Sequence, residues 1–185
     1  MKNEAEVCTI IRNSLVDGFK VPDPSGAFQS TSQRCFDGIG AIKKEDGLHF
    51  VCWEAKYLKA MSAFPFSKIE PHQNYYLNEY NKCIGVISYV ILGVNVGRGD
   101  QRMYVFEWND FMGELYKNRF SIHKDKLEKL PYNEVHKGTF NFDNIITKAD
   151  LEKVYGNMDL VLKGYIEKNK PLETGLTNIL KEHNE

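Results

Sequence analysis

The chain has 185 residues, a hydrophobic fraction of 42% and a formal net charge of −1. This length and hydrophobic content suit one domain with a substantial core and exclude a disordered chain. The near-zero net charge excludes a globally basic nucleic-acid binder, so any DNA-binding surface has to be a local cluster of basic side chains.

The sequence predicts neither a secretory signal nor a membrane span. The N-terminus, MKNEAEVCTIIRNSL, carries acidic and polar residues where a signal peptide needs an apolar stretch. The longest apolar run, residues 83–94, is too short to span a bilayer. We therefore expect a cytoplasmic protein without membrane contact. Its widely spaced cysteines lack the close ligand pairs of a structural zinc site and are interpreted as reduced core residues: Cys8, Cys35, Cys52 and Cys83.

Apolar spacing and turn residues divide the first part of the chain into a helix, a loop and a hairpin. The helix has Asn3 as its expected N-cap and repeats its apolar residues at helical spacing. VPDPSG and QSTSQ gather loop-forming residues, and KKEDG suits a hairpin turn. The predicted elements are a helix over 3–15, a loop over 17–33 and hairpin arms over 36–42 and 48–56.

The rest of the chain predicts a buried strand, a partner strand and several helices. Pro71 suits the first turn of a helix, and the Val- and Ile-rich run after it suits a buried central strand. The predicted elements are a loop over 61–70, a helix over 71–81, strands over 84–94 and 102–108, and helices over 108–118, over 124–130 and after Thr147. This order predicts an α/β or α+β domain with a mixed sheet, with residues 1–146 as core and 147–185 as a helical C-terminal extension packed on or beside it.

The chemically informative residues are Asp37 on the first hairpin arm and Glu54-Ala55-Lys56 at the end of the second. Strand alternation puts Glu54 and Lys56 on the same apolar face as Phe50 and Cys52, a local inconsistency typical of a functional site. The hairpin folds Asp37 back toward Glu54. Two carboxylates and the main-chain carbonyl of Ala55 could then bind Mg²⁺, with Mn²⁺ as a substitute. The alternative is a solvated strand end with a surface ion pair.

The spacing D-x16-E-x-K matches the PD-(D/E)xK nuclease motif, with Phe36 at the nominal proline position. The runs FDGIGAIKKEDGLHFVCWEAK, SAFPFSKIEPHQNYYLNEY and CIGVISYVIL resemble the RecU family of Holliday junction resolvases over roughly residues 29–132. The family's motifs occur here in the same order, as Asp37 with Gly40, Glu54 to Lys56, Phe64-Pro65 and His72-Gln73. The part before Asp37 is shorter than is usual in that family.

The resemblance implies a restriction-endonuclease-like mixed central sheet flanked by helices. It also implies metal ligation by Asp37 and Glu54, a catalytic Lys56 and a supporting role for Gln73. Lys56 would orient the attacking water or stabilise charge on the phosphate. Glu4 or Glu6 could add a further acid, although the favoured interpretation of both is an acid at the positive end of the helix dipole. Residues near the motifs that could contact DNA, or merely solubilise the chain, are Gln33, Arg34, Lys43, Lys44, Lys59, Lys68, His72, Arg98 and Arg102.

The predicted function is that of a Mg²⁺-dependent, structure-selective DNA endonuclease. We expect a homodimeric Holliday junction resolvase that makes paired symmetric nicks in four-way junctions, because a two-fold dimer presents two identical cutting sites. One alternative is another PD-(D/E)xK nuclease acting on linear or branched DNA. Another is a DNA-binding recombination accessory that does not cleave, against which the intact Asp37, Glu54 and Lys56 argue.

Overall fold

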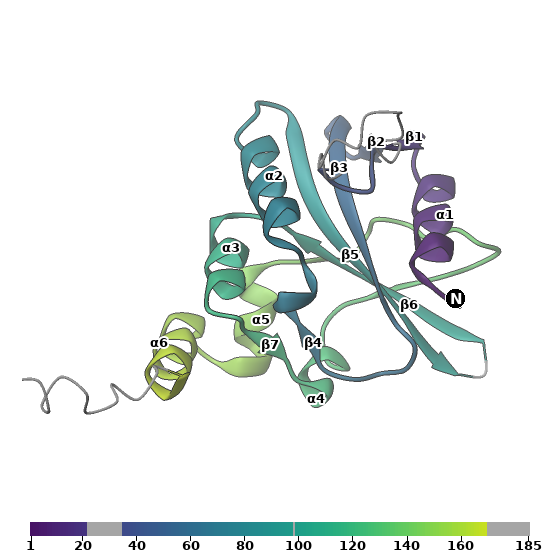
Figure 1. Ribbon diagram of the computed structural model, residues 1–185. Coiled ribbons are helices and arrows are strands. Elements are labelled where there is room, and N and C mark those ends of the chain that lie inside the picture. The colour runs from purple at the N-terminus through teal and green to yellow at the C-terminus, as the bar shows by residue number, and fades with distance from the viewer. Residues whose placement is uncertain (22–34, 98, 170–185) are drawn as a thin grey trace, which may run out of the picture.

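A computed structural model describes residues 1–21, 35–97 and 99–169 (Figure 1). These residues form a mixed α/β fold around a seven-stranded sheet with the order β1-β2-β3-β5-β6-β8, in which β9 also pairs with β6. The sheet is mixed, because β3 runs parallel to β5 and β6 parallel to β9, whereas the other pairs are antiparallel. The strands are β1 (Asp17–Lys20), β2 (Gly38–Lys44), β3 (Gly47–Leu58), β5 (Val86–Gly97), β6 (Asp100–Glu107), β8 (Asn133–Glu134) and β9 (Ile145–Ile146).

Helix α1 (Glu4–Ser14) covers one face of the sheet. The Asn3 side chain accepts a hydrogen bond from the Glu6 N–H and so confirms the predicted N-cap. Val7 and Ile11, one turn apart, are fully buried in a core cluster with Trp53 and Ala55 of β3. Figure 1 shows α1 on the opposite side of the sheet from α2 and α3.

The second face is covered by the long connection between β3 and β5. The connection contains β4 (Phe64–Pro65), the short 3-10 helix η1 (Phe66–Lys68) and α2 (Pro71–Asn81). Leu77 of α2 and Cys52 of β3 belong to the larger core cluster on this side. The alternation predicted for β3 is confirmed, because Cys52 and Val51 lie in clusters on opposite faces.

Several predicted boundaries were wrong. Residues 17–20, predicted as loop, form the edge strand β1, because their backbone pairs with β2 from Asp17↔Ala41 to Lys20↔Gly38. Residues 22–34 of the predicted loop lie outside the described residues. Within the predicted loop 61–70, β4 pairs with β7 (Ser121–Ile122), a contact that local sequence does not specify. The strands β8 and β9 were not predicted, and the helix expected over 124–130 is the single turn α4 (Lys124–Leu127).

The C-terminal helices in the described range are α5 (Lys148–Tyr155) and α6 (Met158–Asn169), after α3 (Asp110–Lys117) in the chain. Leu151 of α5 and Met158 of α6 are fully buried in the same core cluster as Leu77 of α2. None of the helices in the described ranges combines the length and the apolar character that crossing a membrane requires.

Candidate active site

Four of the predicted site residues are buried although their side chains are polar or charged. Glu54 is 2% exposed, Asp37 5%, Lys56 6% and Gln73 9%. A charged side chain is costly to bury unless other groups bond to it, so the partners of these four decide what the cluster can do.

Glu54, Lys56 and Gln73 form a closed triangle of hydrogen bonds. The Lys56 Nζ donates to Glu54 Oε1 at 2.8 Å and to Gln73 Oε1 at 3.2 Å. Gln73 Nε2 donates to the same Glu54 oxygen at 2.7 Å. Two of the three residues are on β3 and the third is on α2, so the triangle fixes the helix relative to the strand.

The position of Gln73 is set by the start of its helix. Its Oε1 also accepts the Glu70 backbone N–H at 2.9 Å, which satisfies a donor at the N-terminus of α2. The same side chain therefore caps the helix and orients Lys56. Because α2 begins at Pro71, Gln73 lies in its first turn and its side chain reaches Glu54 and Lys56 near the end of β3.

Asp37 reaches the site from the start of β2. Its N–H donates to the Trp53 carbonyl at 3.1 Å, and its Oδ2 accepts the Ala55 N–H at 2.9 Å. In a strand, the N–H and C=O of one residue point to the same side. The Ala55 carbonyl therefore points to the side on which Asp37 lies, beyond the end of β2.

Asp37, Glu54 and the Ala55 carbonyl offer a donor set of two carboxylates and one backbone oxygen. Mg²⁺ binds through one or two carboxylates while keeping several waters, so these donors fit it. Among the described residues, no three His, Cys, Asp or Glu side chains gather in a way that could hold a metal. A site here would thus depend on the backbone oxygen and waters as well as on the two carboxylates.

Gly38 allows β2 to approach β3 closely beside Asp37. A Cβ at Gly38 would lie 2.2 Å from Cζ2 of the Trp53 ring and 2.7 Å from the Phe19 carbonyl oxygen. The Trp53 ring is fully buried and the Phe19 contact is with backbone, so neither can easily move. A glycine directly after Asp37 is therefore required for this register.

Cys52 lies two residues before Glu54 on the same strand face. Its Sγ is 3.1 Å from Ser88 Oγ, which donates to the Leu77 carbonyl of α2 at 2.7 Å. Burial raises the pKa of the Cys52 thiol to about 11, so it is a neutral packing group rather than a thiolate ligand. The sequence analysis did not single out Ser88, although a serine within the apolar run 84–94 is a polar residue in a predicted buried strand.

All four cysteines lie in the described part of the chain, and no disulfide joins them. Cys8 and Cys52 are buried, as expected of core residues, whereas Cys83 is exposed. The interpretation as core residues is therefore wrong for Cys83.

The predicted DNA-contacting residues fall into separate regions. Lys59 follows the end of β3, three residues past Lys56, and Lys68 ends η1; both are exposed. His72 precedes Gln73, and its Nδ1 lies 3.4 Å from the Glu70 carboxylate. Lys43 and Lys44 are at the far tip of the β2–β3 hairpin.

The distance to that tip follows from the strand register. Gly38 is opposite Trp53, whereas Lys43 is opposite Leu48, and five strand residues span about 17 Å. The structure therefore does not bring Lys43 or Lys44 to the carboxylates. Arg102 of β6 is paired with Asp100 at 2.9 Å. Gln33, Arg34 and Arg98 lie outside the described residues.

Glu4 and Glu6 are on α1, which packs against the opposite sheet face from Glu54 and Lys56. Glu4 is exposed, and Glu6 Oε2 accepts the Lys2 backbone N–H at 2.7 Å. The structure therefore does not bring either acid to Glu54, and we leave both out of the proposed site.

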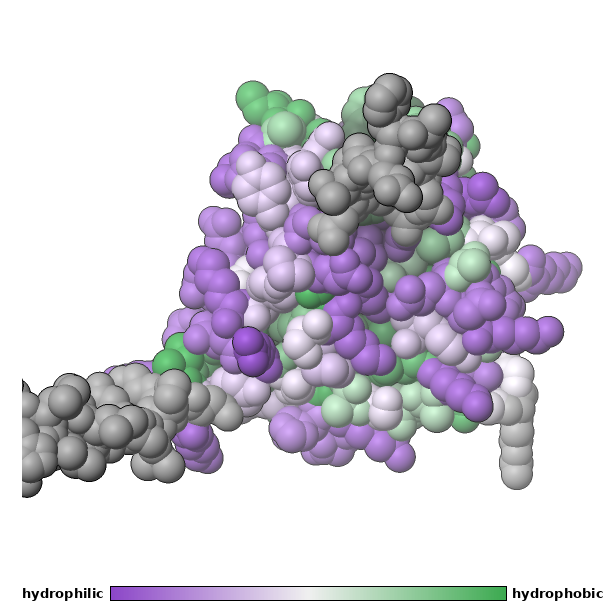
Figure 2. Space-filling view, in the orientation of Figure 1, coloured by the Kyte–Doolittle hydropathy of each residue, from purple (hydrophilic) through white to green (hydrophobic). Residues whose placement is uncertain are grey.

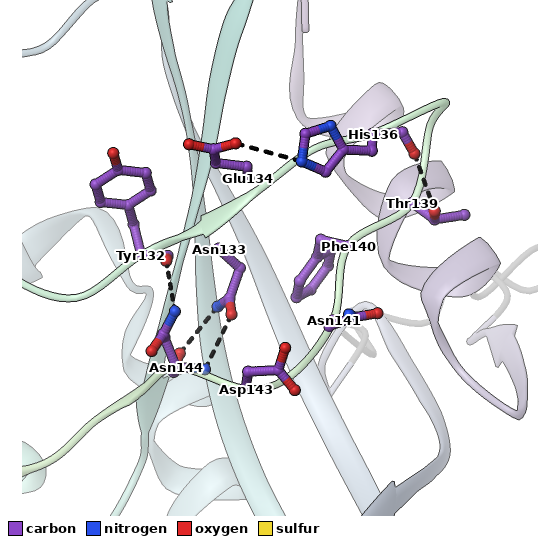
Figure 3. A pocket seen from close by; sticks show the side chains of 9 residues that line it. All are labelled: Tyr132, Asn133, Glu134, His136, Thr139, Phe140, Asn141, Asp143 and Asn144. Carbon is purple, nitrogen blue, oxygen red and sulfur yellow. Dashed lines mark hydrogen bonds and ion pairs between the residues drawn. The ribbon is translucent and has the colours of Figure 1, made fainter.

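A polar pocket of about 500 Å³ lies beyond β6, around the segment between β8 and β9 (Figure 3). Its polar groups bond mainly to one another. Asn133 Nδ2 donates to the Asn144 carbonyl, Asn133 Oδ1 accepts the Asn144 N–H, both at 2.9 Å, and His136 pairs with Glu134 at 3.3 Å. In the sheet order this pocket is three strands from β3, so it is separate from the carboxylate cluster.

The mixed sheet flanked by helices, with buried carboxylates and a lysine at the end of a hairpin, defines a restriction-endonuclease-like protein. The family model described as RecU, Recombination protein U, matches residues 25–150, more than two thirds of the chain. The chain belongs to the RecU family of Holliday junction resolvases. Comparison with curated proteins gives no match.

Proposed function

We propose that the chain is a Mg²⁺-dependent, structure-selective endonuclease that makes paired symmetric nicks in four-way DNA junctions. The observation that carries the proposal is the buried Glu54–Lys56–Gln73 triangle with the Asp37 carboxylate on the adjoining Ala55 N–H. An architectural DNA-binding protein has no physical reason to bury these charges at a strand end, where each must be compensated.

Asp37, Glu54 and the Ala55 carbonyl would hold Mg²⁺, or Mn²⁺ in its place. The bound ion would polarise the scissile phosphate and lower the pKa of a coordinated water. The protein itself positions the carboxylates, since Asp37 is held by Ala55 and Glu54 by both Lys56 and Gln73.

Lys56 acts on the phosphate. Its ammonium group has three N–H donors, of which Glu54 and Gln73 accept two among the described residues. The third donor is available to a phosphate oxygen, where it stabilises the negative charge that develops during hydrolysis. Gln73 is a positioning residue in this scheme, because it fixes the direction in which Lys56 points.

The DNA contacts that are closest in sequence to Lys56 and Gln73 would come from Lys59, Lys68 and His72. Lys43 and Lys44 at the hairpin tip, with Gln33 and Arg34, are proposed as more distant contacts. A homodimer would present two identical sites to the two strands of a nearly two-fold junction. Since the substrate is DNA, we propose that the protein acts in the cytoplasm.

The test compares a four-way junction with linear duplex of the same arm sequences, each with Mg²⁺ and with EDTA. We expect paired nicks in the junction only when the metal is present. Equal cleavage of both substrates would assign the chain to another nuclease activity on linear or branched DNA. Junction binding without cleavage under any divalent metal would assign it to the recombination accessories.

A further inference from the structure

The two neighbouring tyrosines in the middle of α2 lie on different sides of the helix. Tyr75 is 59% exposed, whereas Tyr76 is partly buried and packs against the larger core cluster. Their rings meet edge-on, with centroids 5.2 Å apart. Successive residues of an α-helix are about 100° apart around its axis. Tyr75 therefore points away from Gln73, whereas Tyr76, three residues after Gln73, lies near the side on which Gln73 points.

The contacts of α2 show which neighbour each of its sides faces. Asn78, two residues after Tyr76, faces α3. On the other side, the Tyr80 ring packs edge-on against the ring of Phe36, with centroids 5.0 Å apart. Phe36 directly precedes Asp37 in the chain. Tyr76 is one turn before Tyr80 on this second side, so it lies toward the segment that carries Asp37.

The Tyr76 hydroxyl is available to a ligand. Within the described part of the chain, no residue forms a hydrogen bond with it, and its oxygen is not sealed from solvent. Other partly buried tyrosines use their hydroxyls within the fold, since those of Tyr57 and Tyr155 each bond to backbone at 3.0 Å. The Tyr76 ring is thus held by packing, while its O–H remains a donor at the surface.

His72 extends this polar edge of α2 by one turn. Its Nδ1 lies 3.4 Å from the Glu70 carboxylate, which leaves Nε2 as the ring nitrogen that can meet a ligand. His72 and Tyr76 are four residues apart, so they follow one another along the helix at about 5.4 Å. In the orientation of Figure 1, the surface over α2 is mostly hydrophilic, in contrast to the hydrophobic surface at the α2–β5 connection (Figure 2). Such an edge suits a chain of polar groups, and tyrosine hydroxyls are among the donors that contact DNA phosphates.

We propose that the Tyr76 hydroxyl donates a hydrogen bond to the DNA phosphate next to the scissile one. The inference rests on the proposed function, because it takes the scissile phosphate to lie at Lys56. Gln73 orients Lys56, and Tyr76 is one turn further along α2, so the neighbouring phosphate of a strand that follows the helix comes within its reach. A hydrogen bond to a charged oxygen is stronger than one between neutral groups. Stacking on a nucleobase suits Tyr76 less well, because its ring already packs against the core and against Tyr75.

The test combines Tyr76→Phe with four-way junctions in which single phosphates on either side of the cut are replaced in turn by uncharged methylphosphonates. Tyr76→Phe keeps the packed ring and removes only the hydroxyl. We expect its single-turnover cleavage at subsaturating enzyme and with Mg²⁺ to be slower by about tenfold. One methylphosphonate next to the cut should slow the wild type by a similar factor and leave Tyr76→Phe unaffected, so the two losses do not multiply. The matched control is Tyr75→Phe, which removes a hydroxyl from the outward side of α2 and should equal the wild type on every substrate.

A merely structural role for Tyr76 predicts a different pattern, because a packing defect would multiply with the loss from every methylphosphonate. That pattern, undiminished cleavage by Tyr76→Phe, or an equal loss in Tyr75→Phe would each overturn the contact and leave the nuclease proposal standing. A wild-type chain that cleaves no junction would instead sink the nuclease proposal. The same variants and substrates are then compared by junction binding in Ca²⁺, where a loss shared by Tyr76→Phe and one methylphosphonate supports the contact and independent losses overturn it.

Discussion

Replacing Lys56 by alanine should destabilise the fold, because it removes the cation that balances a buried carboxylate. Glu54 is 2% exposed and accepts hydrogen bonds from Lys56 and Gln73 on one oxygen. Of these two donors to Glu54, Lys56→Ala removes one and leaves Gln73. The Glu54 carboxylate would then lose the ammonium group that compensates part of its buried charge.

The magnitude follows from the burial of the pair. Removing one member of a buried ion pair costs about 3–5 kcal/mol, and the remaining Gln73 bond favours the low end of that range. We therefore expect the free energy of unfolding to fall by about 3 kcal/mol at neutral pH in EDTA, which for a chain of this size lowers Tm by roughly 6–12 °C. Glu54→Gln should cost less, because its amide oxygen still accepts a hydrogen bond from Lys56.

The assay is urea denaturation of wild type, Lys56→Ala, Glu54→Gln and the double variant, all in EDTA. The four values form a double-mutant cycle, in which we expect a coupling of about 2 kcal/mol between Lys56 and Glu54. Lys82→Ala is the control, because Lys82 pairs with Glu79 at 2.6 Å on the exposed surface and should leave Tm unchanged within error. A coupling near zero would refute the argument that burial makes this pair interdependent.

Catalysis gives a second prediction: Lys56→Ala should leave junction binding nearly intact and lower single-turnover cleavage by about 10²-fold or more, and undiminished cleavage would remove Lys56 from the mechanism. Asp37→Asn and Glu54→Gln should each abolish most cleavage activity. Mg²⁺ and Mn²⁺ should support cleavage, whereas Ca²⁺ should permit DNA binding with little turnover. Full activity in EDTA would contradict a metal mechanism. Junction binding should exceed linear-duplex binding by at least about tenfold at moderate salt, with a salt slope equal to a few phosphate contacts; equal affinities in a gel-shift assay would count against junction selectivity. Gly38→Ala should destabilise the fold by about 1–3 kcal/mol in urea denaturation, because its Cβ would meet the buried Trp53 ring, and a neutral effect would show that the strands can separate there.

The elements predicted correctly are those whose cause is local. Asn3 caps α1 through a side chain three residues from its partner, and the hairpin follows from a turn between two alternating strands. Strand β1 was missed because residues 17–20 become a strand only by pairing with β2. The two strands are separated in sequence, and local residue patterns do not predict such a pairing.

In the candidate site, too, local sequence predicted the residues but not the contacts between distant segments. Alternation along β3 was enough to put Glu54 and Lys56 on one face, and the resemblance to the RecU family pointed to Gln73. The hydrogen bonds among them depend on where α2 crosses β3, which no local pattern specifies. Lys43 and Lys44 were assigned to the DNA surface because they are near the motif in sequence, but the hairpin register moves them to its far tip.

The parallel pairing of β3 with β5 has a consequence for the order of folding. The hairpin with Glu54 and Lys56 can form early, since its strands are adjacent in sequence, whereas β5 joins only after the chain has passed through α2. Until that crossover closes, Gln73 is not held against Lys56, and the Lys56 side chain lacks the hydrogen bond that fixes its direction. A nascent or partly folded chain would then carry both motif carboxylates but lack the assembled site that we propose for cleavage.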